Sequence, residues 1–230
     1  MKPWLIEQWC FAPTADPDFV SHMEDVLDVY ERPYDATHPV VCLDETSRQL
    51  LGETRAPQPV APGIAARSDP EYVRGGTAQL FLVTEPLRGW RHIAVGAQRT
   101  RFDFAHCIQE LVDVHYPLAE RVVLVLDQLN IQSTASLYAA FPPAEAKRLT
   151  KKLEIHHTPK HGSWLNMAEL ELSVLARQCL ARRLPDQTTM TKAVTAWADR
   201  RNAAIHAIDW QFTTADARIK LRRLYPEFDA

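Results

Sequence analysis

The sequence predicts a single mixed α/β domain, and three observations support this class. The chain has 230 residues, of which 46% are hydrophobic and 24% charged, an ordinary globular composition that is long enough for one large core. Short continuous apolar runs at 39–43 and 122–126 are typical of buried strands. Strand patterns come first along the chain and then alternate with helical ones, which is typical of a sheet flanked by helices.

The first half predicts one helix followed mainly by extended structure. Residues 18–30 form a helix because apolar side chains recur there at helical spacing, namely Phe19, Met23, Val26, Leu27 and Tyr30. The buried strand 39–43 ends at Asp44, and the proline-rich segment 53–75 is expected to be irregular. Two strands at 78–84 and 92–97 then form a hairpin through a turn at 85–89.

The second half alternates helices and strands. A helix at 102–115 is closed by Pro117, and the strand 122–126 ends at Asp127. The remaining expected elements are short helices at 133–141 and 143–153, a strand at 153–157, a long helix at 163–182 with Ser163 as its N-cap, and a helix at 188–202.

Composition excludes several classes of protein. The four cysteines lie far apart without a CxxC pair, so neither a disulfide framework nor a zinc ribbon is indicated, and a cytoplasmic location is expected. No apolar run approaches the roughly 20 residues that span a bilayer, and Glu7 interrupts the apolar stretch near Met1, against a signal peptide. A net charge of −3 neither requires nor excludes nucleic acid. The phosphate loop, nucleophile elbow and HExxH motifs are missing, so no nucleotide cofactor is expected.

Two of the apolar strands end in aspartate, at Asp44 and Asp127. Ligands of open α/β sheets usually bind beyond strand ends. An aspartate is also a common turn residue, so each one alone carries little weight.

A third carboxylate stands out on the helix expected from residue 163. At about 100° per residue, Glu169 falls on the arc of apolar side chains that must be buried, whereas Glu171 falls outside it. A buried carboxylate needs a partner, which is either a metal ion or an arginine such as Arg121 or Arg177. If Glu169 meets the two aspartates, the three charges require a cation, and magnesium with phosphoryl transfer on nucleic acid is the natural chemistry.

Three blocks of sequence resemble the catalytic blocks of one enzyme family. They are Val-Cys-Leu-Asp-Glu-Thr at 41–46, Val-Leu-Val-Leu-Asp-Gln-Leu-Asn at 123–130, and His-Thr-Pro-Lys-His-Gly-Ser-Trp-Leu-Asn-Met-Ala-Glu at 157–169. These blocks resemble bacterial insertion-sequence transposases of the mariner-like superfamily, in the insertion sequence 630 group. The resemblance covers nearly the whole chain, including segments 4–9, 23–27, 85–90 and 210–218.

The resemblance implies a ribonuclease H-like fold, with a mixed central sheet flanked by helices, and a DDE triad. Asp44, Asp127 and Glu169 match the triad, and would be both catalytic residues and ligands of two Mg²⁺ or Mn²⁺ ions. Residues expected to support the triad or contact DNA are Asn130, Lys160, His161 and Asn166. Residues 1–35 would form a helical extension packed on the core, and 36–230 the catalytic domain.

The implied activity is DNA strand cleavage and strand transfer during transposition. The partners would be element ends and target DNA, with a homodimer in the DNA complex, no membrane, and a cytoplasmic location on the bacterial nucleoid. Members of this family carry N-terminal helix-turn-helix modules, and we expect none in the residues before Pro39, so the chain resembles a catalytic domain alone. Gln128 and Gln132 replace a usual Asn and His, and the usual Asn near Gly76 is missing.

Other signals leave alternatives open. The histidines at 156, 157 and 161 would suit zinc by number, but Pro159 breaks the helix that their spacing needs. Arginine clusters at 177–183, 200–201 and 218–223 are either solvated faces or contacts to a DNA backbone. Trp90 and Trp164 stack on bases or pack in the core. Rival functions are an inactive transposase remnant that only binds DNA, and a ribonuclease H-like nuclease.

Overall fold

A computed structural model describes residues 15–67, 69–129 and 131–226. Its centre is a five-stranded sheet in the order β3-β2-β1-β4-β5. The strands are β1 (Val40–Glu53), β2 (Tyr72–Glu85), β3 (Trp90–Gly96), β4 (Val122–Leu126) and β5 (Leu153–His157). Strands β1, β2 and β3 are antiparallel neighbours, whereas β4 runs parallel to both β1 and β5.

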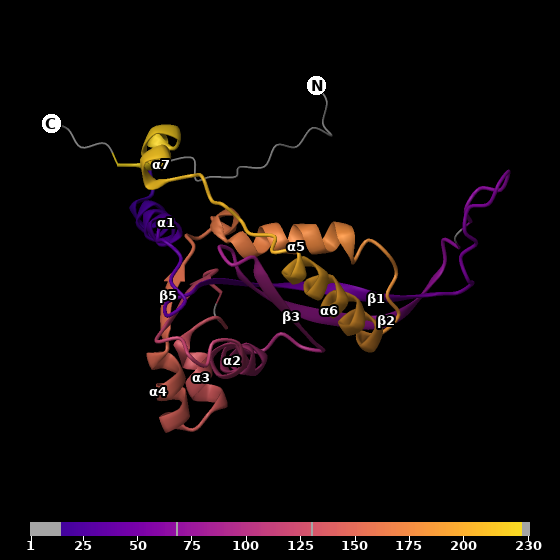
Figure 1. Cartoon of the computed structure of the whole chain (residues 1–230), viewed down its shortest axis with the longest axis horizontal. Helices are drawn as coiled ribbons and strands as arrows, with labels where there is room; N and C mark the ends of the chain where they lie inside the picture. Colours follow the sequence, from indigo (N-terminus) through magenta and orange to yellow (C-terminus); the bar gives the residue numbers. More distant parts are fainter. Residues whose placement is uncertain (1–14, 68, 130, 227–230) are drawn as a thin grey trace.

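Helices cover both faces of this sheet (Figure 1). In chain order they are α1 (Pro17–Tyr30), α2 (Arg101–Glu110), the π-helical turn η1 (Leu111–His115), α3 (Thr134–Ala140), α4 (Pro143–Lys151), the 3₁₀ turn η2 (Ser163–Leu165), α5 (Met167–Gln178), α6 (Gln187–Ala203), α7 (Thr214–Lys220) and η3 (Arg222–Leu224). In the figure α5 and α6 lie on one side of the sheet, and α2, α3 and α4 on the other.

The alternation of side chains along β1 separates two hydrophobic cores. Cys42 belongs to the core that contains α1, α5 and α6, whereas Val41 and Leu43 belong to the core of α2, α3 and α4. Successive strand residues point to opposite faces. Asp44 therefore lies on the α5 face, and Glu45 on the α2 face.

Helix α1 is tied to the core through its last residue. The buried hydroxyl of Tyr30 donates a hydrogen bond of 2.7 Å to the carbonyl oxygen of Leu165, and accepts one of 3.4 Å from the backbone N–H of Met167. Pro17 stands in the first turn and the Asp16 side chain caps the helix, as expected for a helix N-terminus. The helix predicted at 18–30 is therefore confirmed, while the division at residue 35 into extension and catalytic domain stays a prediction.

Several element boundaries differ from those predicted. The strand expected to end at Asp44 continues to Glu53, so Asp44 lies inside β1, where it pairs with Leu82 of β2. Residues 53–75 were expected to be irregular, but β2 begins at Tyr72, and the remaining connection from β1 projects away from the rest of the molecule (Figure 1). The helix expected at 102–115 changes to a π-helical turn at Leu111. No helix within the described ranges is long and apolar enough to cross a membrane.

Candidate active site

Asp44 and Asp127 lie side by side on neighbouring strands. The parallel register pairs Cys42 of β1 with Val125 of β4, and each aspartate stands two residues further along its strand direction. Both also point to the α5 face, because Cys42 and Val125 belong to the core on that face. Adjacent strands are about 4.8 Å apart, so the register brings the two carboxylates into one site.

Glu169 reaches this site from the first turn of α5. The helix does not start at Ser163, as predicted, but at Met167, with Asn166 as its N-cap. Residues Ser163–Leu165 form a separate 3₁₀ turn. The Asn166 side chain accepts a hydrogen bond of 3.1 Å from the backbone N–H of Ala168. The half-buried Glu169 is then the third helical residue, where the helix dipole favours a negative charge.

Two side chains hold the Asp127 carboxylate in place. The Asn166 amide Nδ2 donates to Oδ1 of Asp127 at 3.2 Å and to the carbonyl oxygen of Leu43 at 3.0 Å. The buried Thr158 hydroxyl donates to the same Oδ1 at 3.0 Å. Asn166 therefore connects β1, β4 and α5, the three elements that carry the carboxylates. Sequence reasoning missed Thr158, although it lies in the recognised block 157–169.

The site is strongly acidic. Burial, followed by the charge of Asp127 and with smaller contributions from Glu45 and Glu169, raises the pKa of Asp44 to about 7. Among the described residues, no Lys or Arg nitrogen lies within 4.0 Å of Asp44, Asp127 or Glu169. The arginines considered as partners of Glu169 are engaged elsewhere, because Arg121 lies near Glu154 and Arg177 donates to Ser173.

This donor set fits a hard divalent cation. Carboxylate oxygens are the ligands that Mg²⁺ and Mn²⁺ prefer, and a cation would relieve the repulsion that raises the Asp44 pKa. The ligand oxygens of Asp44, Asp127 and Glu169 do not all lie within 4.8 Å of one another. In the described ranges, the one set of three acidic, His or Cys ligand atoms that all lie within 4.8 Å of one another is His92, Glu110 and His115.

Three other residues were predicted to support the triad or contact DNA, namely Asn130, Lys160 and His161. Lys160 and His161 are exposed in the loop after β5. Lys160 lines a surface cavity together with Gln128, the residue that follows Asp127. His161 has a φ of 64°, in the left-handed region that histidine enters more readily than most residues. Asn130 lies outside the described residues.

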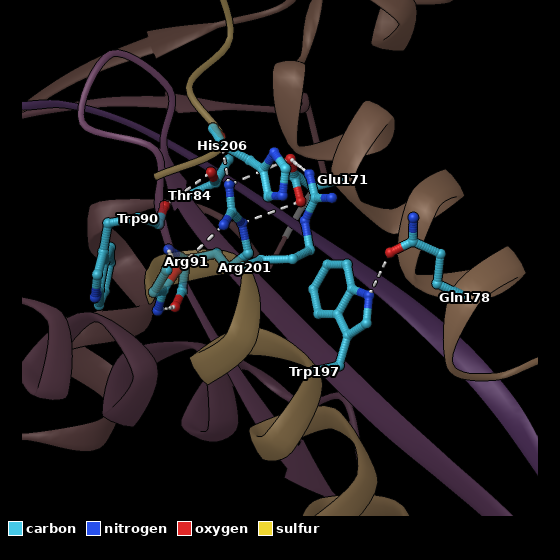
Figure 2. Close-up of polar contacts among 9 residues, drawn as sticks. Thr84, Trp90, Arg91, Glu171, Gln178, Trp197, Arg201 and His206 are labelled. Atoms are coloured by element: carbon cyan, nitrogen blue, oxygen red, sulfur yellow. Dashed lines mark hydrogen bonds and ion pairs between the residues drawn. The ribbon is translucent and has the colours of Figure 1, made fainter. Parts of the chain in front are cut away.

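The helical-wheel interpretation is wrong for both glutamates of α5. Glu169, which was placed on the buried arc, is only half-buried, whereas Glu171 lies on the buried face with Met167, Ala168 and Leu175. Glu171 was placed outside the buried arc, but it is 2% exposed and forms ion pairs with two arginines. Oε2 lies 3.1 Å from Nε of Arg91, and Oε1 lies 2.9 Å from Nη2 of Arg201 (Figure 2). Arg91 also donates to the carbonyl oxygen of His206 at 2.7 Å. This charged cluster joins β3, α5 and α6, and it accounts for one member of the arginine clusters that were candidates for DNA contact.

Gln132 has a structural role on the opposite side of β1. It is fully buried and its amide donates to the carboxylate of Glu45, which also lies 3.5 Å from Nη1 of Arg99. Burial raises the pKa of Glu45, while Arg99 and Gln132 oppose this. Gln132 stands where the family usually has His. Its amide stabilises the buried carboxylate of Glu45, which lies on the opposite face of β1 from Asp44.

The tryptophans and the histidine group have structural surroundings that the described ranges show. Trp90 and Trp164 pack against the two hydrophobic cores. His156 lies 2.8 Å from Asp25 and 3.1 Å from Glu154, while His157 contacts the backbone oxygen of Asp127. The histidines at 156, 157 and 161 therefore do not form a common metal site in the described structure.

Comparisons with known proteins identify one family and several solved structures that the chain resembles. Residues 39–191 match the family described as DDE superfamily endonuclease. The chain resembles the Mos1 mariner paired-end complex with Mn, at 15% identity and a TM-score of 0.57, over 88% of this chain and 62% of that chain. It also resembles the Mos1 strand transfer complex, at 14% identity and a TM-score of 0.58, over 88% of this chain and 60% of that one. A third similar structure is the Mos1 mariner paired-end complex with Mg, at 14% identity and a TM-score of 0.58, over 97% and 67%.

These matches confirm the predicted ribonuclease H-like fold. The chain spans about three fifths of the length of the first two structures. No curated protein matches it.

Proposed function

The chain belongs to the family of DDE superfamily endonucleases, and we propose that it is the catalytic domain of a transposase of the insertion sequence 630 group. It would cut DNA at the ends of a mobile element and transfer the strands to target DNA. The observation that carries this proposal is the register of β1 and β4, which sets Asp44 beside Asp127 on the face covered by α5, the helix of Glu169.

Asp44, Asp127 and Glu169 would hold two Mg²⁺ or Mn²⁺ ions. Such ions, when bound, activate the attacking oxygen and stabilise charge on the leaving oxygen of a phosphodiester. The protein contributes a fixed ligand set. Both Thr158 and Asn166 donate to Oδ1 of Asp127, which orients the carboxylate and leaves Oδ2 without a protein donor in the described ranges. Asn166 also fixes the start of α5, and with it the position of Glu169.

Element ends and target DNA are the proposed partners, with two copies of the chain in the DNA complex. The resemblance to paired-end and strand transfer complexes supports this proposal. Exposed basic side chains are available to follow a DNA backbone. Lys160, in the loop after β5, lines a cavity with Gln128, the residue after Asp127. Arg182 and Arg200 line one cavity between α5 and α6. Phosphate contacts by such residues would make binding fall steeply with salt.

The test is cleavage of supercoiled DNA that carries the inverted repeats flanking the coding sequence, with Mg²⁺ or Mn²⁺. The wild-type chain is expected to nick at the repeat ends. Asp44→Asn, Asp127→Asn and Glu169→Gln should each abolish nicking, because each removes a charged metal ligand while keeping the shape of the side chain. Glu45→Gln is the matched control, because Glu45 neighbours Asp44 but lies on the opposite face and binds Gln132.

Three outcomes would contradict the proposal. Nicking by Asp127→Asn at the wild-type rate would exclude the triad. Binding of repeat DNA by the wild-type chain with no nicking in Mn²⁺ would favour the inactive remnant. Equal nicking of DNA with and without the repeats would favour a general nuclease on the same fold.

A further inference from the structure

A second cluster of metal-ligand side chains lies away from the three carboxylates. His92 on β3, Glu110 at the end of α2 and His115 at the end of η1 offer ligand atoms that all lie within 4.8 Å of one another. We propose that these three residues bind a zinc ion, and that this ion fastens the edge strand β3 to the α2–η1 segment.

The distances are close to those that zinc requires. Nε2 of His92 lies 3.5 Å from Oε1 of Glu110, and Nε2 of His115 lies 3.7 Å from the same oxygen. Zinc bonds of 2.0–2.2 Å in a tetrahedron place neighbouring ligand atoms about 3.3 Å apart. These two separations exceed that value by only a few tenths of an ångström, and the ligand atoms of His92 and His115 lie within 4.8 Å of each other.

The environment of His115 indicates that a partner is missing. Its side chain is 19% exposed, and Nε2 is buried with no hydrogen-bond partner within the described ranges. The 3.7 Å separation from Glu110 is too long for a hydrogen bond. A buried polar atom without a partner is rare and needs an explanation, and a zinc ion among the three ligands would supply it.

The local structure holds the ligands in place. The π-helical turn carries His115, and such turns are frequent at functional sites. The Trp90 ring lies 4.9 Å from the His115 ring and 6.4 Å from the His92 ring, centroid to centroid. The side chains of His92 and Glu110 are 34% and 44% exposed, so an ion can enter from solvent and a fourth coordination position stays open to water.

The ligand set selects a different ion from the one that suits the triad. Two imidazoles and one carboxylate suit zinc and similar transition metals, whereas three carboxylates suit magnesium.

The two sites also lie on opposite faces of the sheet. Trp90 and Ala94 on β3 pack against the α2-side core, so His92 points to that face, whereas Asp44 points to the face of α5. The zinc proposal therefore does not depend on the proposed transposase activity.

The test uses the full chain with Asp44→Asn, Asp127→Asn and Glu169→Gln combined, so that the carboxylate site is removed. After dialysis against a chelator, the protein is titrated with Zn²⁺ by calorimetry and with Co²⁺ by visible absorption. We expect a single equivalent of either metal, ligand-field bands of low-coordinate Co²⁺, and a Tm that rises with Zn²⁺ concentration, because the ion binds only the folded chain.

Variants of the ligands locate the site. Glu110→Gln and His115→Phe should abolish the Co²⁺ bands and the Zn²⁺-dependent rise in Tm, and the phenyl ring keeps a ring against Trp90. His156→Asn is the matched control, because His156 also lies beside two carboxylates, and it should bind metal like the parent. The proposal is overturned if the parent binds neither metal, or if Glu110→Gln binds as tightly as the parent.

Discussion

The side-chain amide of Asn166 lies 3.2 Å from Oδ1 of Asp127, and the same side chain caps the helix that carries Glu169. One residue thus sets the relative position of two of the three carboxylates.

Asn166→Ala should impair cleavage more than stability. Loss of an N-cap costs about 0.5–2 kcal/mol, which urea unfolding will measure. Asp186→Ala removes the exposed N-cap of α6, whose side chain accepts from Thr189, and should have a similar effect on stability with little effect on nicking. Equal loss of nicking in both variants would mean that Asn166 acts through stability alone.

The stability of the metal-free protein should fall as pH rises. The pKa of Asp44 is about 7 in the folded chain, against 3.8 for the ordinary side chain, so the folded chain binds this proton more tightly than the unfolded one. The stability from this group is complete below about pH 4 and is lost as pH rises through about 7, with an upper limit of about 4 kcal/mol.

Unfolding by urea with chelator present, between about pH 4 and pH 8, will show this loss. Asp44→Asn should reduce the slope, and Mg²⁺ should also reduce it by favouring the ionised carboxylate. A slope that is identical in wild type and Asp44→Asn would refute the assignment of the titration to Asp44.

Arg91→Met should destabilise the fold strongly. The side chain of Arg91 is fully buried against Glu171, and removal of one partner of a buried pair costs about 3–5 kcal/mol. Arg218→Met is the control, because Arg218 pairs with Glu24 while 63% exposed, and it should change the free energy of unfolding far less, since exposed ion pairs contribute little. Similar values for the two variants would show that Arg201 alone satisfies Glu171.

Tyr30→Phe should loosen the start of α5. It removes the donor to the Leu165 carbonyl oxygen and the acceptor for Met167, at a cost of about 1–3 kcal/mol for buried groups left unpaired. Hydrogen exchange of the Met167 and Ala168 amides should accelerate. Tyr225→Phe, which removes a partly buried hydroxyl bound to Glu24, should leave those amides unchanged.

The backbone conformation at His161 predicts how strongly different substitutions there destabilise the protein. Because φ is 64° there, His161→Val should cost about 1–2 kcal/mol, whereas His161→Asn should be nearly neutral. Thermal unfolding measures both. If the imidazole also contacts DNA, His161→Asn will weaken DNA binding at unchanged Tm; unchanged binding would limit His161 to a role in the turn.

Local patterns predicted the buried strand that ends before Asp127 and the start of the strand that carries Asp44, because a short apolar run is a short-range feature. They wrongly ended the first strand at Asp44, since β1 continues to Glu53 by pairing with β2, a long-range contact. They failed at Glu171, because the wheel took its reference from Leu165, which lies before α5, and centred the apolar arc away from the face that the helix buries. The partner of Glu171 is Arg91, 80 residues away, and no local pattern indicates such a pair. The cluster of His92, Glu110 and His115 was missed for the same reason, because its members come from three separate elements.

The hydroxyl of Tyr30 has a practical consequence for anyone who shortens this protein. The family match begins at residue 39, after α1, yet Tyr30 holds the junction before Glu169, and Ala217 of α7 belongs to the same core. A fragment trimmed to the matched residues 39–191 would expose that core and release the glutamate-bearing helix. Expression boundaries and fusion points therefore belong outside α1 and α7.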